Sequence, residues 1–230
     1  MASADSERRV ESLGIWSVAR RGESEFDRGV SFFDAIYGFA ATLLVSNLDP
    51  LEPQAWASLQ GLADAGAVQQ VTGFVLSFIV IAVFWRINVK LVRRLKAMDG
   101  PTVAANMLAA CLVVLLPFTT QGISDPQTAD LPLPTALYAV NVAAVAMAQT
   151  LMAQIARSRG LERHPVPSAV HRILLADALV TPLYFLATVP VALVAGAETA
   201  RLSWLGLLIV APLVGRFALR RAEQRLDAAE

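Results

Sequence analysis

The chain has 230 residues, of which 56% are hydrophobic, and its 19 Lys and Arg balance its 19 Asp and Glu to a formal net charge of zero. Its mean hydropathy is +0.54, and the apolar residues form long uninterrupted runs rather than amphipathic stripes. This pattern excludes an ordinary water-soluble domain and indicates a membrane protein. The single cysteine, Cys111, excludes both a disulfide framework and a metal-binding cluster of cysteines.

Six stretches are long enough to cross a hydrocarbon core, which takes about 20 residues of helix. In chain order they are residues 31–48, 68–89, 102–120, 133–156, 170–195 and 202–217. The first run follows a polar segment and lacks a small-residue cleavage site, so we expect no removable signal peptide. The sequence therefore predicts an all-α membrane protein with six transmembrane helices. Its expected divisions are a cytoplasmic N-terminal segment (1–30), a transmembrane domain (31–217) and a cytoplasmic tail (218–230).

Charge is distributed unevenly between the predicted connections. Of the 19 Lys and Arg, 18 lie before the first span, at the ends of the second, fourth and sixth, or at the starts of the third and fifth. The opposite connections carry acidic residues and a single basic one, Arg201. By the positive-inside rule, both termini are expected in the cytoplasm. Because membrane insertion accounts for these basic clusters, no nucleic-acid partner is expected.

The first span begins with two charged residues, Arg28 and Asp34. An ionised Asp costs about 2.5 to 3.5 kcal/mol at the centre of a membrane helix and less near the interface, so Asp34 should have a partner. The candidates are Arg28 and three donors at the inner end of the second span, namely the Trp85 indole N–H, Arg86 and Asn88. We interpret this group as an interhelical clasp, with contact to a transported solute as the alternative.

One face of the first span combines large apolar side chains with hydroxyls. Phe39, Thr42, Leu43 and Ser46 follow the i, i+3, i+4, i+7 spacing of a helix face. In a closed ring of subunits, this face would form stacked rings, in which apolar rings gate by dewetting and hydroxyls replace part of an ion's hydration shell. The alternative is ordinary packing, with both hydroxyls bonding back to the backbone one turn earlier.

The segment "RGVSFFDAIYGFAATLL" resembles the Arg-x-x-x-Phe-Ser-Asp signature of the transmembrane protein 175 family of potassium channels. Arg28, Phe32 and Asp34 match this signature, and Phe33 replaces its Ser. The stretches "SFIVIAVFWRINVKL" in the second span and "LLPFTTQ" in the third resemble the same family. The three stretches lie in the right order on the right helices, so the resemblance covers nearly the whole chain.

The resemblance implies a potassium-selective channel of the single-repeat, six-helix type, which is a homotetramer in the plasma membrane with the first helix lining a central pore. It needs no cofactor and no bound metal, and its partners are potassium ions, the lipid bilayer and further copies of the chain. The constriction maps to Phe39, Leu43 and Ser46, with the Thr42 hydroxyl beside them as the selectivity group. The family has no "TVGYG" filter, and the chain contains none. The resemblance also implies a structural role for the signature residues Arg28, Phe32 and Asp34.

Two positions depart from the family pattern. Phe39 stands where Ile or Leu is usual, and four inward benzyl groups would plug the axis more fully than aliphatic side chains. Ser46 replaces the outermost apolar ring and would make the outer vestibule wetter. A non-conducting membrane scaffold subunit therefore remains an alternative.

Other polar residues in the spans leave further interpretations open. Asn106, Asn141 and Gln149 are predicted to form interhelical hydrogen bonds. Asp177 in the fifth span is predicted to pair with Arg172, although intramembrane acids are also functional candidates. A secondary transporter or proton pathway using Asp34 and Asp177 is thus an alternative function. Enzyme classes are not expected, since the chain has no catalytic triad, HExxH motif or phosphate-binding glycine loop.

Overall fold

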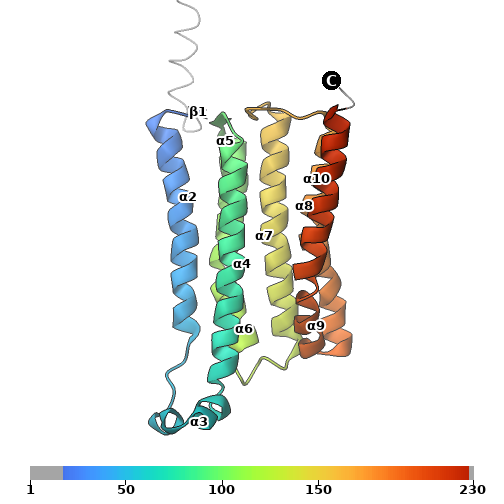
Figure 1. The fold of residues 1–230 in the computed structure, drawn as a ribbon. Helices are drawn as coiled ribbons and strands as arrows, with labels where there is room; N and C mark the ends of the chain where they lie inside the picture. The colour runs from blue at the N-terminus through green and yellow to red at the C-terminus, as the bar shows by residue number, and fades with distance from the viewer. Residues whose placement is uncertain (1–17, 228–230) are drawn as a thin grey trace, which may run out of the picture.

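The computed structural model describes residues 18–227 as a bundle of long helices that stand side by side (Figure 1). Six helical segments are long and apolar enough to cross a membrane, which confirms the predicted all-α class and the six spans. The expected N-terminal segment and C-terminal tail lie partly outside the described residues. Both ends of the described chain lie at one end of the bundle, here called the terminal end, and α3 lies at the other, the α3 end (Figure 1).

The described chain contains two short strands (β1 and β2), two 3-10 helices (η1 and η2) and the α-helices α2 to α10. Their bounds are β1 (Ala19–Arg20), α2 (Ser24–Leu43), η1 (Leu44–Asn47), η2 (Pro53–Ala57), α3 (Leu59–Asp64), α4 (Ala67–Arg93), β2 (Ala97–Met98), α5 (Gly100–Val114), α6 (Leu116–Ser124), α7 (Pro132–Ser158), α8 (Ser168–Ala195), α9 (Ala197–Trp204) and α10 (Leu207–Asp227).

Three of the six spans differ in detail from the predicted ones. The helix of the first span begins at Ser24 rather than Ser31, because its first turns extend the helix beyond the apolar run. The third span is divided at Leu115 into α5 and α6, where Pro117 in the first turn of α6 cannot donate a backbone hydrogen bond. The sixth span is divided into α9 and α10 by a turn after Trp204.

The core lies around α7, which is the most buried of the six spans. Small residues let the neighbouring helices approach it closely, as expected of membrane bundles. On α7 the buried small residues include Ala136, Ala139, Ala143 and Ala146. A similar close approach joins α4 to α6, because a Cβ added at Gly73 would lie 2.5 Å from the Cβ of Ser124.

A collar of backbone and ionic contacts closes the terminal end. Strands β1 and β2 pair antiparallel, with Ala19 opposite Met98. The Arg21 guanidinium donates to the carbonyls of Val92 and Leu95 at 2.8 and 3.0 Å, so it satisfies carbonyls at the C-terminus of α4. The N-terminal strand is therefore fastened to the turn between α4 and α5.

Asp99 links this collar to α7. Its carboxylate accepts a 3.1 Å hydrogen bond from the Thr102 backbone N–H, which caps α5, and pairs with the Arg159 guanidinium just after α7. Burial opposes ionisation of this carboxyl, but the hydrogen bonds from Thr102 and Arg159 outweigh burial and hold the pKa of Asp99 below its usual value of 3.8. The ionised form of Asp99 is thus the one that stabilises the collar.

Candidate functional site

Helix α2 stands at one edge of the bundle and packs mainly against α4 and α5 (Figure 1). Its inward stripe consists of Phe33, Tyr37, Ala40 and, on η1, Leu44, all of which are at most 2% exposed. The spacing of these residues is that of a single helical face. The rotation of α2 about its own axis is therefore fixed by this stripe.

The opposite face of α2 is exposed and carries the four residues expected to share it. Phe39 is 68% exposed and Leu43 is 36% exposed, and Thr42 and Ser46 are exposed as well. The α-helix ends at Leu43, so Ser46 lies on the 3-10 turn rather than on a continuous α-helix. Residues three apart eclipse one another in a 3-10 helix, which keeps Ser46 in line with Leu43.

The two hydroxyls of this face differ in their contacts. Thr42 Oγ1 donates a 2.8 Å hydrogen bond to the Phe39 carbonyl, as in the packing alternative derived from the sequence. The Thr42 oxygen keeps its capacity to accept, because a hydroxyl has two lone pairs beside its one donor. The structure gives no such back-bond to Ser46 within residues 18–227. Both oxygens can therefore accept from water or face a cation.

The α3 end of α2 is held by two side-chain contacts. The Asn47 amide donates a 2.5 Å hydrogen bond to the carbonyl of Pro117, which lies near the α5–α6 break. The backbone N–H of Asp49 donates to the Gln70 side-chain oxygen at 2.9 Å. The end of η1 is thus fixed to α6 and to α4.

At the terminal end, the predicted clasp forms with one of its four candidate donors. The Trp85 indole Nε1–H donates a 2.9 Å hydrogen bond to Oδ1 of Asp34. Among the described residues no ion pair joins Arg28 or Arg86 to Asp34. Asn88 instead donates to the Asn106 side chain on α5. The clasp therefore joins α2 to α4 through a tryptophan rather than through an arginine.

The signature phenylalanine lies differently from its neighbour. Phe32 is 52% exposed, whereas Phe33 is buried at 2% exposure, and the two rings meet edge to face with centroids 5.8 Å apart. Arg28 is also exposed within this single chain. Within the chain, the contact of the signature segment with the bundle is thus made by Phe33 and Asp34.

Buried polar residues join α2 to the centre of the bundle. Gln149 on α7 donates 2.9 Å hydrogen bonds to the Tyr37 hydroxyl and to the Phe84 carbonyl of α4. Asn106 contacts Asn88, and the Asn141 amide lies 3.2 Å from the Thr119 hydroxyl. The predicted interhelical roles of the three amides are confirmed. Sequence reasoning missed Tyr37, whose only signal was a polar tip in an apolar stripe.

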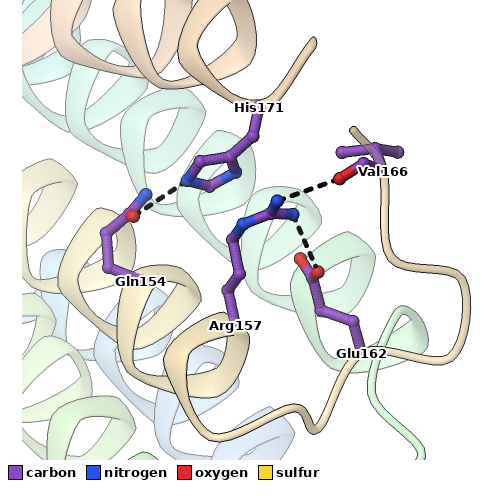
Figure 2. Close-up of polar contacts among 5 residues, drawn as sticks. All are labelled: Gln154, Arg157, Glu162, Val166 and His171. Carbon is purple, nitrogen blue, oxygen red and sulfur yellow. Dashed lines mark hydrogen bonds and ion pairs between the residues drawn. The ribbon is translucent and has the colours of Figure 1, made fainter. Parts of the chain in front are cut away.

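A second polar group lies where α7 and α8 meet at the terminal end (Figure 2). His171 Nε2 lies 2.9 Å from the Gln154 side-chain oxygen, and Arg157 contacts both the Glu162 carboxylate and the Val166 carbonyl (Figure 2). These contacts hold the connection between the two helices.

The predicted ion pair of Asp177 with Arg172 is wrong. The ion pairs among residues 18–227 are Arg157–Glu162, Arg159–Asp99 and Arg201–Asp130. Positions 172 and 177 are five residues apart on the helix, which places their side chains on different faces. In the same described residues, no group of three or more His, Cys, Asp or Glu could hold a metal ion.

Part of this arrangement is similar to a known protein family. Residues 28–117 match the family model described as "Endosomal/lysosomal potassium channel TMEM175". The match begins at the signature Arg28, includes the exposed face of α2 and ends at Pro117 in the α5–α6 break. The chain is thus similar to the TMEM175 family over 90 of its 230 residues. The resemblance stated from the sequence is thereby confirmed.

Two known proteins extend the comparison beyond the matched segment. A potassium channel of Chryseobacterium sp. strain P1-3 is 26% identical over 142 residues, which are 61% of this chain and 70% of that protein. The crystal structure of a lysosomal potassium-selective channel TMEM175 homolog from Chamaesiphon minutus superposes with a TM-score of 0.59 and 21% identity. The superposition covers 86% of this chain and 98% of the homolog's chain. At this level of identity, the likeness to the crystal structure shows the fold.

Proposed function

We propose that the protein is a potassium-selective channel in which four copies of α2 surround a central pore. The observation that carries the proposal is the exposed face of α2, which combines Phe39 and Leu43 with the hydroxyls of Thr42 and Ser46 on a helix at the edge of the bundle. A single subunit has one such face, so several copies are needed to enclose a path, and closed rings are the usual symmetric solution. The match of residues 28–117 to the TMEM175 family model supports the same conclusion.

In the proposed pore, Phe39 and Leu43 form apolar rings that close the path by dewetting. Thr42 provides oxygens between them that stand in for part of the hydration shell of a potassium ion. Ser46 provides a polar ring at the wider outer mouth. No "TVGYG" filter takes part, since the sequence contains none.

The proposed orientation places the terminal end in the cytoplasm of a cell whose plasma membrane the protein crosses six times. This proposal rests on the positive-inside rule. The basic residues gather at the terminal end, at the ends of α4, α7 and α10, whereas the connections of the α3 end carry Asp49, Glu52, Asp125, Asp130 and Glu198.

A planar-bilayer recording of the purified protein under opposed potassium and sodium gradients tests the function. We expect an electrogenic current that reverses near the potassium equilibrium potential. Reversal near the sodium value contradicts potassium selectivity. Saturating, coupled flux indicates the transporter alternative, and the absence of any flux indicates a scaffold subunit.

Native mass spectrometry in a mild detergent tests the assembly separately. We expect a homotetramer as the dominant species. A preparation that contains only monomers while remaining folded would contradict the enclosed pore. Phe39→Asp is a second variant for the same measurement. Four carboxylates facing one axis repel one another, so this variant should weaken the tetramer. The changed side chain does not enter the core of the single subunit.

A further inference from the structure

A deep groove lies away from α2, between α4 on one side and α7, α8 and α10 on the other. Its volume is about 840 Å³, within the usual range of small-molecule sites. Along α4, the lining extends from Leu76 to Arg94, a distance of roughly 27 Å at 1.5 Å per residue. The groove is therefore long enough to hold an extended hydrocarbon chain.

The walls of the groove are mainly apolar. On α4 they consist of aliphatic residues such as Ile79, Val83 and Ile87, and the far end is closed by Tyr138, Phe185 and Trp204. The rings of Phe185 and Trp204 lie 5.6 Å apart between centroids, so this end is a packed aromatic wall. An occupant must present hydrocarbon along most of its length.

The polar rim at the terminal end is largely satisfied by its own contacts. Gln154 and His171 bond to each other, while Glu162 and the Val166 carbonyl are engaged by Arg157 (Figure 2). Arg94 lies at the mouth of the groove, where its side chain is exposed to solvent and screened by it. The rim thus leaves little charge directed into the groove.

Asp177 lines the groove farther into the membrane-spanning helix α8 than His171 does. It lies nine residues into the helix that begins at Ser168, about 13 Å along its axis. Its carboxylate makes no hydrogen bond or ion pair with any residue between 18 and 227. On α10, a Cβ added at Gly215 would lie 3.8 Å from Asp177 Oδ1. The carboxylate therefore lines the groove without a polar partner among the described residues.

We propose that this groove binds an amphiphilic amine, whose protonated nitrogen pairs with the Asp177 carboxylate while its hydrocarbon chain lies against α4 and α10. A carboxylate away from bulk water is costly unless it is paired, and an ammonium group supplies both the opposite charge and hydrogen-bond donors. The apolar walls supply the hydrophobic contribution. This site is separate from the proposed pore and does not depend on the channel function.

The test uses the full-length protein in nanodiscs of phosphatidylcholine and a dodecylamine that carries a diazirine at the end of its chain. After irradiation, labelled peptides are identified by mass spectrometry. We expect saturable labelling of α4, α8 and α10 that excess dodecylamine removes and excess dodecanol does not. Asp177→Asn should reduce the labelling at least tenfold, and Asp177→Glu should restore most of it.

Two further variants separate the site from general insertion into lipid. Ala211→Phe fills the groove from α10 without altering charge and should reduce labelling by a similar factor. Glu198→Gln, at an exposed acid on α9, should leave labelling unchanged. Each variant is first checked for a wild-type thermal midpoint.

Several results would overturn the proposal. Labelling that is equal in the wild type and Asp177→Asn shows that the amine only partitions into lipid around the protein. Labelling by the matching diazirine dodecanoate at equal strength shows that the groove does not select a positive charge. A phospholipid that stays bound to the groove of both the wild type and Asp177→Asn, and that blocks the amine, shows that the groove binds lipid without a charge preference.

Discussion

The side chain of Gln149 donates a 2.9 Å hydrogen bond to the hydroxyl of Tyr37, and so joins the central helix α7 to the helix that presents Phe39. Tyr37 lies only two residues before Phe39, on the buried stripe that fixes the rotation of α2. The same Gln149 amide also donates to the Phe84 carbonyl. This contact therefore positions the exposed face relative to the core.

Tyr37→Phe removes the hydroxyl and leaves Gln149 bonded to Phe84. We expect a loss of about 0.5 to 1.5 kcal/mol in the free energy of unfolding, the usual net value of one hydrogen bond. Gln149→Leu leaves the Tyr37 hydroxyl unpaired and should cost more, about 1 to 3 kcal/mol. Denaturant unfolding in detergent measures both, with the exposed Gln121→Leu as the control. Equal stability of all four proteins would show that the contact contributes nothing.

Asp34→Ala removes the acceptor of the Trp85 indole. Because this hydrogen bond is partly exposed, we expect a loss of about 1 kcal/mol and weaker assembly, with unchanged ion preference. Trp85→Phe should have a similar effect, and the double variant should be little worse than either single one. Asp34→Asn keeps an acceptor and is the matched control. A variant that assembles normally but changes its ion preference would place Asp34 on the ion path.

Phe39→Ala should increase the resting current of the proposed channel and reduce its selectivity, because a wider opening admits hydrated ions. Phe39→Asn should conduct even if the opening barely widens, since a polar ring wets where an apolar ring does not. Bilayer recordings compare both variants with Phe118→Asn, which changes an equally exposed phenylalanine on α6. If only Leu43→Asn raises the current, the constriction lies at Leu43.

The collar at the terminal end should lose stability in acid. The pKa of Asp99 is lower in the folded protein than in the unfolded chain, so its contribution is present above about pH 3.8 and disappears as the pH falls through the folded value. Asp99→Asn keeps a capping acceptor but loses the charge that pairs with Arg159. We expect it to be less stable than the wild type near neutral pH, by about 1 kcal/mol or less. The difference should vanish in acid. A constant difference across the pH range would exclude this origin.

The sequence by itself determined the class, the number of spans and the exposed face of α2. An apolar run of about 20 residues can satisfy its backbone in lipid only as a helix, so hydropathy suffices to count the spans. The spacing of Phe39, Thr42 and Leu43 on one face follows from the helical period. The signature beginning at Arg28 was enough to indicate the family.

The tertiary structure alone decided which polar groups meet. Four donors were available to Asp34, and the packing of α2 against α4 brought Trp85 to it. Gln149 and Tyr37 are 112 positions apart, and Asp177 faces a groove instead of Arg172. Hydropathy and helical period are local properties of the chain, whereas the partner of a polar side chain depends on how a distant helix is rotated and how closely it packs. No local pattern records that rotation, because helices in a membrane are oriented by the packing of side chains from all their neighbours at once.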